Sequence, residues 1–161
     1  MHESQLQFEH IYLATDHAGF IHKNAIRDWL KSENIAVTDF GAFVNNPDDD
    51  FPNFISQAAR AVSQNQKHGA IIFGGSGQGE ALLANRFPRV RACVYYGGNQ
   101  EIVSLMREHN DSNIMSIGAR FIDIDEAKSC IWQWLHLPRN EEEKYIRRNQ
   151  QISHITKEIH T

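Results

Sequence analysis

Residues 70–80 read AIIFGGSGQGE, and the architecture of the chain can be inferred from this stretch. Four apolar residues in a row, without polar alternation, are typical of a strand that is buried on both faces of a parallel sheet. A glycine-rich turn follows, and Glu80 suits the first turn of a helix because its charge complements the helix dipole. The stretch therefore predicts a strand, a tight turn and a helix.

The same alternation continues on both sides of this unit. Apolar runs predict four further strands, at residues 11–14, 35–37, 92–95 and 114–117. Helical spacing predicts helices at about residues 20–30, 52–66, 81–85, 102–109 and 141–159. A further helix is predicted to begin at a cap formed by Asp123 or Asp125 and to run to about residue 135. This order predicts an α/β fold, a Rossmann-like three-layer sandwich with a five-stranded parallel sheet.

The last predicted helix has few apolar residues for a core element: Tyr145, Ile146, Ile152, Ile155 and Ile159. We expect it to pack outside its own domain. The predicted organisation is an α/β domain over residues 1–140 and a C-terminal helix over residues 141–161 that packs on a partner subunit and serves dimerisation.

Composition excludes several classes of protein. The 161 residues carry 16 Lys+Arg against 20 Asp+Glu, so a general nucleic-acid or anionic-membrane surface is not expected. The N-terminal MHESQLQFEH lacks the basic start and apolar stretch of a signal peptide, and no apolar run approaches the roughly 18 residues of a membrane span. Cys93 and Cys130 have no metal or redox spacing. These features predict a reduced, cytoplasmic protein.

Three functional interpretations of the glycine-rich turn compete. A phosphate-binding P-loop needs lysine where Glu80 stands, and a dinucleotide-binding fingerprint needs a third small residue at the same place, although Asp39 could serve a ribose. The third interpretation is an oxyanion hole built from the amides of residues 76–79, with Glu80 as a base and Ser76 beside the same oxygens. That pairing suits proton abstraction next to a carbonyl. A plain glycine turn capped by Glu80 remains an equally good alternative from this stretch alone.

Other polar clusters each have a functional and a structural interpretation. Asp16 and His17 follow the first strand, where ligands bind in such folds, but Asp there is also a common helix cap. His109 and Asn110 could be an acid/base and a hydroxyl partner, or a helix C-cap. Basic residues could form a phosphate clamp across a subunit boundary, or merely a solvated charged face: Arg120, Lys144, Arg147 and Arg148.

Seven short segments, taken in order, resemble the family of type B ribose-5-phosphate isomerases and galactose-6-phosphate isomerase subunits. They are ATDHAGF (14–20), DFG (39–41), DDDFP (48–52), GGSGQGE (74–80), ANR (84–86), REHN (107–110) and IGAR (117–120). The resemblance covers roughly residues 10–150. It implies an aldose–ketose isomerase that opens the sugar ring and passes through a cis-enediolate, without a metal or organic cofactor.

The resemblance also implies which residues act. One branch of the family uses a cysteine at the end of the third strand as the base; here Gly74 holds that position, and Glu80 matches the glutamate of the other branch. It implies roles for Ser76 in moving protons between the sugar oxygens and for His109 in ring opening. It implies that Asp16 and Asn110 hold sugar hydroxyl groups. The anion hole would be formed by the loop residues Gly75, Gly77, Gln78 and Gly79. The phosphate would be bound by His17, Arg120, Lys144 and Arg148.

Departures from the family pattern surround the sugar tail and the phosphate. Phe51 replaces a usual Tyr, so the resemblance implies that it contacts the substrate by ring packing alone, without a hydroxyl contact. Lys144 replaces a usual Arg, and Gln78 a frequent Asn. The predicted function is interconversion of ribose 5-phosphate and ribulose 5-phosphate by a homodimer, or alternatively a homotetramer, with no nucleic-acid or membrane partner. The alternatives are an isomerase of a six-carbon sugar phosphate and a non-catalytic module that binds sugar phosphates or nucleotides.

Overall fold

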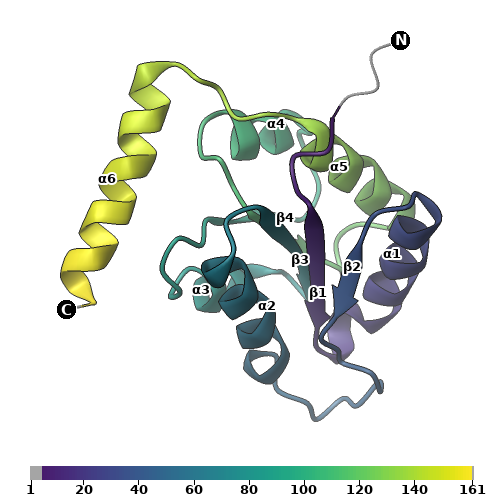
Figure 1. Cartoon of the computed structure of the whole chain (residues 1–161). Coiled ribbons are helices and arrows are strands. Elements are labelled where there is room, and N and C mark those ends of the chain that lie inside the picture. The colour runs from purple at the N-terminus through teal and green to yellow at the C-terminus, as the bar shows by residue number, and fades with distance from the viewer. Residues whose placement is uncertain (1–4, 161) are drawn as a thin grey trace.

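A five-stranded, all-parallel sheet forms the centre of the computed structural model, which describes residues 5–160 (Figure 1). Its strand order is β2-β1-β3-β5-β4. The strands are β1 (His10–Thr15), β2 (Val37–Asp39), β3 (His68–Gly74), β4 (Ala92–Tyr95) and β5 (Ile114–Gly118). The predicted five-stranded parallel sheet is confirmed.

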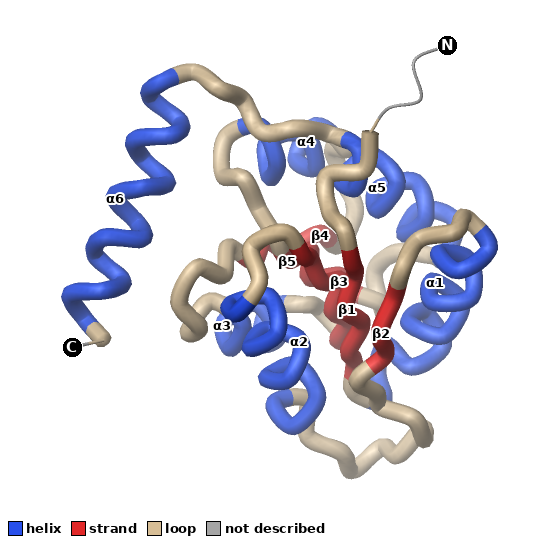
Figure 2. Tube along the Cα trace, in the orientation of Figure 1, coloured by secondary structure: helices blue, strands red, loops and turns tan. Residues whose placement is uncertain are grey.

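Helices cover both faces of the sheet, as Figure 2 shows. They are η1, a short 3-10 helix (His17–Gly19), α1 (Phe20–Ser32), α2 (Pro52–Gln64), α3 (Gln78–Ala84), α4 (Glu101–Glu108), α5 (Ile124–His136) and α6 (Glu143–Ile159). The apolar faces of α1, α4 and α5 form one core with the sheet, and those of α2 and α3 form a second core on its other face. Three layers result, as the sequence predicts.

Most boundaries of the helices and strands agree with those predicted from the sequence. The position of β2 differs from its prediction for a simple reason. The second strand begins at Val37 rather than Ile35, because the chain turns through Asn34 (φ 60°) and the amide of Ile35 donates back to the carbonyl of Leu30 at 3.0 Å. At the start of α5 the cap is Asp123, whose carboxylate accepts the amide of Glu126 at 2.8 Å.

The sheet order creates a switch point. From β1 the chain moves outward to β2 and then returns to add β3 on the other side of β1. Connections on the two sides run in opposite directions, and in α/β folds ligands bind at the carboxyl ends of the strands at such a point, which here are the ends of β1 and β3. Asp16 follows β1 directly, and Gly74 ends β3.

The long connection between β2 and α2, residues 40–51, is fixed at its start by a buried lysine. Lys23 has no exposed surface, and its Nζ donates to both carboxylate oxygens of Asp39 at 2.9 and 2.8 Å and to the carbonyl of Ala42 at 2.8 Å. An ammonium group without water needs such partners, because its burial is otherwise very costly. Lys23 therefore ties this connection to α1.

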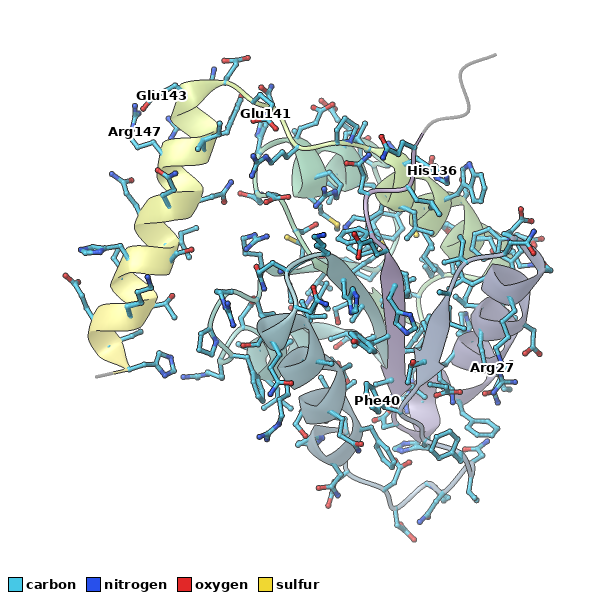
Figure 3. All side chains as sticks on the ribbon, viewed as in Figure 1. Arg27, Phe40, His136, Glu141, Glu143 and Arg147 are labelled. Atoms are coloured by element: carbon cyan, nitrogen blue, oxygen red, sulfur yellow. The ribbon has the colours of Figure 1, made fainter. Side chains whose placement is uncertain are left out.

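The C-terminal helix α6 stands apart from the sheet (Figures 1 and 2). None of its residues is buried, and Ile152, Ile155 and Ile159 are 52, 54 and 74 % exposed. Their spacing places them on one helical face. At its start, Glu143 and Arg147 project away from the rest of the chain (Figure 3). Among residues 5–160, no helix has the length and apolar content to cross a bilayer.

Candidate active site

The glycine-rich loop after β3 is held by the end of β5. The carbonyl of Gly74 accepts the amide of Ala119 at 2.8 Å, and the carbonyl of Gly75 accepts the amide of Arg120 at 3.1 Å. In a trans peptide the carbonyl and the next amide point in opposite directions. The amides of Gly75 and Ser76 are therefore directed away from β5.

These amides donate to no acceptor among the described residues, and neither does the amide of Gly77. Gly77 adopts a left-handed conformation (φ 77°), which glycine reaches without steric cost, and its carbonyl accepts the hydroxyl of Ser116 at 2.7 Å. Successive unpaired amides of this kind form a concave site that attracts negative charge. The loop is thus a candidate anion hole.

Glu80 lies in the first turn of α3, and only 5 % of its surface is exposed. Its carboxylate packs directly on the Cα of Gly74, so closely that a Cβ at position 74 would overlap it. Burial raises the pKa of Glu80 above its ordinary value, and the negative charge of Asp16 raises it further, against a lowering by the backbone amide of Glu80 itself. A carboxylate in this state is a stronger base than an ordinary glutamate side chain.

Asp16 and His17 join the same site from the end of β1. Asp16 is 8 % exposed, and one of its oxygens accepts the amide of Ala18 at 2.9 Å. The Nδ1 of His17 lies 2.7 Å from Oδ1 of Asp49, which the connection before α2 supplies. Asp16, His17 and Asp49 are the one group of potential metal ligands found in residues 5–160, with ligand atoms within 4.8 Å of one another.

Two further predicted residues flank the loop. The guanidinium Nη1 of Arg120 lies 2.9 Å from the position that a Cβ on Gly75 would take, and the ring of Phe51 lies 3.0 Å from the equivalent position on Gly79. Ser76 is half-buried, and its hydroxyl accepts the amide of Gln78 at 3.3 Å. The structure thus brings nine of the predicted residues to one edge of the sheet: Asp16, His17, Phe51, Gly75, Ser76, Gly77, Gly79, Glu80 and Arg120.

Gln78 is nearby but differs from these. It is exposed, and it lines a groove beside the end of α6 together with Leu82 and Ile159. Its backbone belongs to the loop, but this groove lies outside the cluster around Glu80.

The remaining predicted residues lie elsewhere in the chain. His109 and Asn110 follow α4 and precede β5, so they sit at the amino end of β5, whereas Gly118 and Arg120 lie at its carboxyl end. Four residue steps of strand separate the ends by roughly 13 Å. Lys144, in α6, is exposed and pairs with Glu142 at 3.1 Å; Arg148, in the same helix, is also exposed. A single chain therefore does not bring these four residues to Glu80.

His109 is nonetheless held in a defined position. Its ring stacks on Tyr145, with centroids 4.3 Å apart and an interplanar angle of 15°, and its carbonyl accepts the side-chain amide of Asn149 at 3.1 Å. Just after it, Asp111 binds the guanidinium groups of Arg107 and Arg91 at 3.1 and 3.2 Å.

Sequence reasoning assigned no role to Asp111 or to Asp49. Asparagine, proline and aspartate at Asn46-Pro47-Asp48-Asp49 predict a tight turn, which fixes the backbone at Asp49. The turn is the feature of the sequence that could have drawn attention to this residue. The arginines that meet Asp111 come from three separate segments, so nothing in their spacing reveals the cluster: Arg91, Arg107 and Arg139.

Comparisons with known proteins identify the family of the chain. Residues 11–152 match the Ribose/Galactose Isomerase family. A protein named ribose-5-phosphate isomerase B from Mycolicibacterium paratuberculosis is 35 % identical over 139 residues, which cover 86 % of this chain and 86 % of that protein.

Solved structures show the same fold. Ribose-5-phosphate isomerase B from Clostridium thermocellum superposes with a TM-score of 0.86 at 32 % identity, covering 93 % of this chain and 99 % of that chain. The Mycoplasma genitalium enzyme, solved with bound ribulose 5-phosphate, gives a TM-score of 0.88 at 28 % identity, covering 96 and 99 %. In its fold and across most of its length, the chain belongs to the ribose/galactose isomerase family.

Proposed function

We propose that the protein is an aldose–ketose isomerase that interconverts ribose 5-phosphate and ribulose 5-phosphate. The observation that carries the proposal is the buried carboxylate of Glu80 beside Gly74 and a loop of unpaired amides. Relatives named ribose-5-phosphate isomerase B, and one of them solved with ribulose 5-phosphate, support this choice of substrate.

In this proposal Glu80 removes the proton from C2 of the open-chain sugar and returns it to C1. The enediolate formed between the two steps carries negative charge on oxygen, which the amides of residues 75–77 stabilise. Ser76 passes the hydroxyl proton between O1 and O2, and Asp16 holds sugar hydroxyl groups. The raised pKa of Glu80 supports its role, because such a carboxylate is a stronger base than an ordinary one and removes the proton from C2 more readily.

A second copy of the chain completes the site in this proposal. His109 and Asn110 would reach the Glu80 of the partner to open the sugar ring and hold a hydroxyl. Lys144 and Arg148 would add to the phosphate contacts of His17 and Arg120. The exposed apolar face of α6 supports such a dimer, since three large side chains on one helical face need a cover.

Leu82 and Val94 line a groove together with Ile159, so the apolar face of α6 continues into further apolar surface that a second copy could cover. We therefore assign residues 141–161 to the dimer interface and residues 1–140 to the α/β domain. A cytoplasmic location is part of the proposal, and the free thiols of Cys93 and Cys130 are consistent with it.

Substituting Glu80→Gln should lower kcat for ribose 5-phosphate by about 100-fold or more, with little change in KM, because the base is lost while the phosphate contacts remain. In the unsubstituted protein, kcat/KM should fall as the pH decreases through a value above the ordinary glutamate pKa of 4.5, because burial raises the pKa of Glu80. Steady-state kinetics across pH test both expectations. Near-full activity of the variant would refute the base assignment.

The same variant has a predicted effect on stability. A carboxyl whose pKa is raised by folding stabilises the native state only when protonated, and that contribution disappears as the pH rises through the raised value. Glu80→Gln should therefore melt at a higher temperature than the unsubstituted protein at pH 7. The difference should vanish below pH 4.5, the ordinary glutamate pKa. A lower melting temperature at pH 7 would show that the charged carboxylate is favourably paired.

Gly74→Ala should displace the Glu80 carboxylate, because the new Cβ would occupy its place. The carboxylate ends a flexible side chain and can move, so we expect kcat to fall by about tenfold or more with the fold preserved. Kinetics and circular dichroism measure the two effects. An unchanged kcat would mean that the carboxylate acts from another position.

Mixing two inactive variants tests whether the site is shared. If Glu80 and His109 act across a two-fold interface, a mixed dimer of Glu80→Gln and His109→Ala chains has one site with both changes and one with neither. Random exchange makes half of all dimers mixed, so activity should recover to about a quarter of the unsubstituted level. No recovery after verified subunit exchange would place both residues in sites formed by one chain.

A further inference from the structure

The side chain of Asp49 holds His17 through two contacts. Its Oδ1 lies 3.1 Å from the backbone amide of His17 and 2.7 Å from the ring Nδ1. A carboxylate only accepts hydrogen bonds, so Nδ1 carries a proton in this arrangement. The second ring nitrogen, Nε2, donates to no other described residue and is available to a ligand.

Burial makes this contact strong. The side chain of Asp49 is only 9 % exposed, and its Oδ2 has no hydrogen-bond partner among the described residues. The negative charge of Asp49 is therefore poorly solvated and acts mainly on the imidazole. Asp16 adds a second carboxylate, with its Oδ2 3.9 Å from the same Nδ1.

We propose that Asp49 is a positioning residue for substrate phosphate, acting through His17; this rests on the function proposed above. Phosphate oxygens are acceptors, and an imidazole with its only proton on Nδ1 would present a lone pair to them from Nε2. The imidazolium form donates from both nitrogens. Asp49 on one side and a phosphate on the other stabilise that cation in the complex, as carboxylates do for histidines that bind anions or metals through their other nitrogen.

The local sequence presents Asp49 in a fixed place. In the turn Asn46-Pro47-Asp48-Asp49, the carbonyl of Asn46 accepts the amide of Asp49 at 3.1 Å, and the side chain of Asn46 accepts the amide of Asp48 at 3.0 Å. Lys23 fixes the start of the same connection through the carbonyl of Ala42. The His17 ring therefore contacts a carboxylate that is ordered before substrate arrives, which lowers the entropic cost of binding.

A cation bound among Asp16, His17 and Asp49 is the alternative use of this cluster. Their ligand atoms lie within 4.8 Å, but the distance of 2.7 Å from Nδ1 to Asp49 is that of a hydrogen bond, which requires a proton where an ion would bind. The geometry favours a hydrogen bond from Nδ1 of His17 to Asp49 over a bound cation.

The test compares Asp49→Asn with Asp50→Asn. The first substitution keeps an oxygen acceptor and the shape of the side chain while removing its charge, and Asp50 is a neighbouring, exposed carboxylate. Asp49→Asn should raise KM for ribose 5-phosphate and the inhibition constant of inorganic phosphate by about tenfold, the loss of one charge-assisted contact, with kcat within about twofold. Asp50→Asn should leave all three within about twofold.

A double variant separates positioning from general stability. If Asp49 acts through His17, then His17→Asn with Asp49→Asn should bind phosphate no more weakly than His17→Asn alone. Nitrogen-15 NMR of the labelled ring should also show the proton on Nδ1 in the unsubstituted protein and its loss or redistribution in Asp49→Asn.

Three results would overturn the proposal. They are additive effects of the two substitutions, a fall in kcat with KM and phosphate affinity unchanged, and activity that chelation abolishes and Mg²⁺ or Mn²⁺ restores only when Asp49 is present. Calorimetric titration with inorganic phosphate needs no turnover. A protein that lacks isomerase activity but loses phosphate affinity on Asp49→Asn would refute the proposed function and leave this inference standing.

Discussion

The contact between the carboxylate of Glu80 and the backbone of Gly74 is the constraint on which the site depends. It requires a glycine at the end of β3, because any Cβ there would take the space of the carboxylate. It also requires α3 to begin immediately after the loop, so that its first turn aims Glu80 back at the sheet. A carboxyl group buried in this way, with no positive partner among the described residues, costs stability and persists only where the fold is otherwise secure. The buried parallel strands supply the stability that offsets this cost.

The chain separates the predicted residues into two groups at opposite ends of its strands. The glycine-rich loop, Glu80, His17 and Arg120 lie after the carboxyl ends of β1, β3 and β5, whereas His109 lies before the amino end of β5 and the predicted basic residues Lys144 and Arg148 belong to α6. The stack on Tyr145 and the hydrogen bond from Asn149 to its carbonyl hold His109 in place, far along the chain and the sheet from Glu80. A fixed position for His109 so far from Glu80 is explained if His109 of one chain acts in the site of a second copy, as proposed above.

The sequence predicts the sheet well because buried parallel strands are continuous apolar runs, and the run before Gly74 is the clearest of them. It predicts the Glu80 site for a related reason, since a glycine turn between a strand and a helix places its amides and the next acidic residue together. Ile35 shows where such reasoning fails: its apolar character suggests a strand, but a hydrogen bond to Leu30 ties it to the end of α1. The sequence does not reveal a role for Asp49 because its partner His17 is 32 positions away. Only folding brings Oδ1 of Asp49 within 2.7 Å of Nδ1 of His17.

Isomerisation of ribose 5-phosphate in heavy water tests the central claim most directly. If Glu80 carries the proton between C2 and C1 through an enediolate, solvent deuterium should appear at C1 of ribulose 5-phosphate and at C2 of the recovered ribose 5-phosphate, and Glu80→Gln should abolish this exchange. Isomerisation that proceeds at full rate without any incorporation of deuterium, or exchange that persists in the variant, would contradict the account.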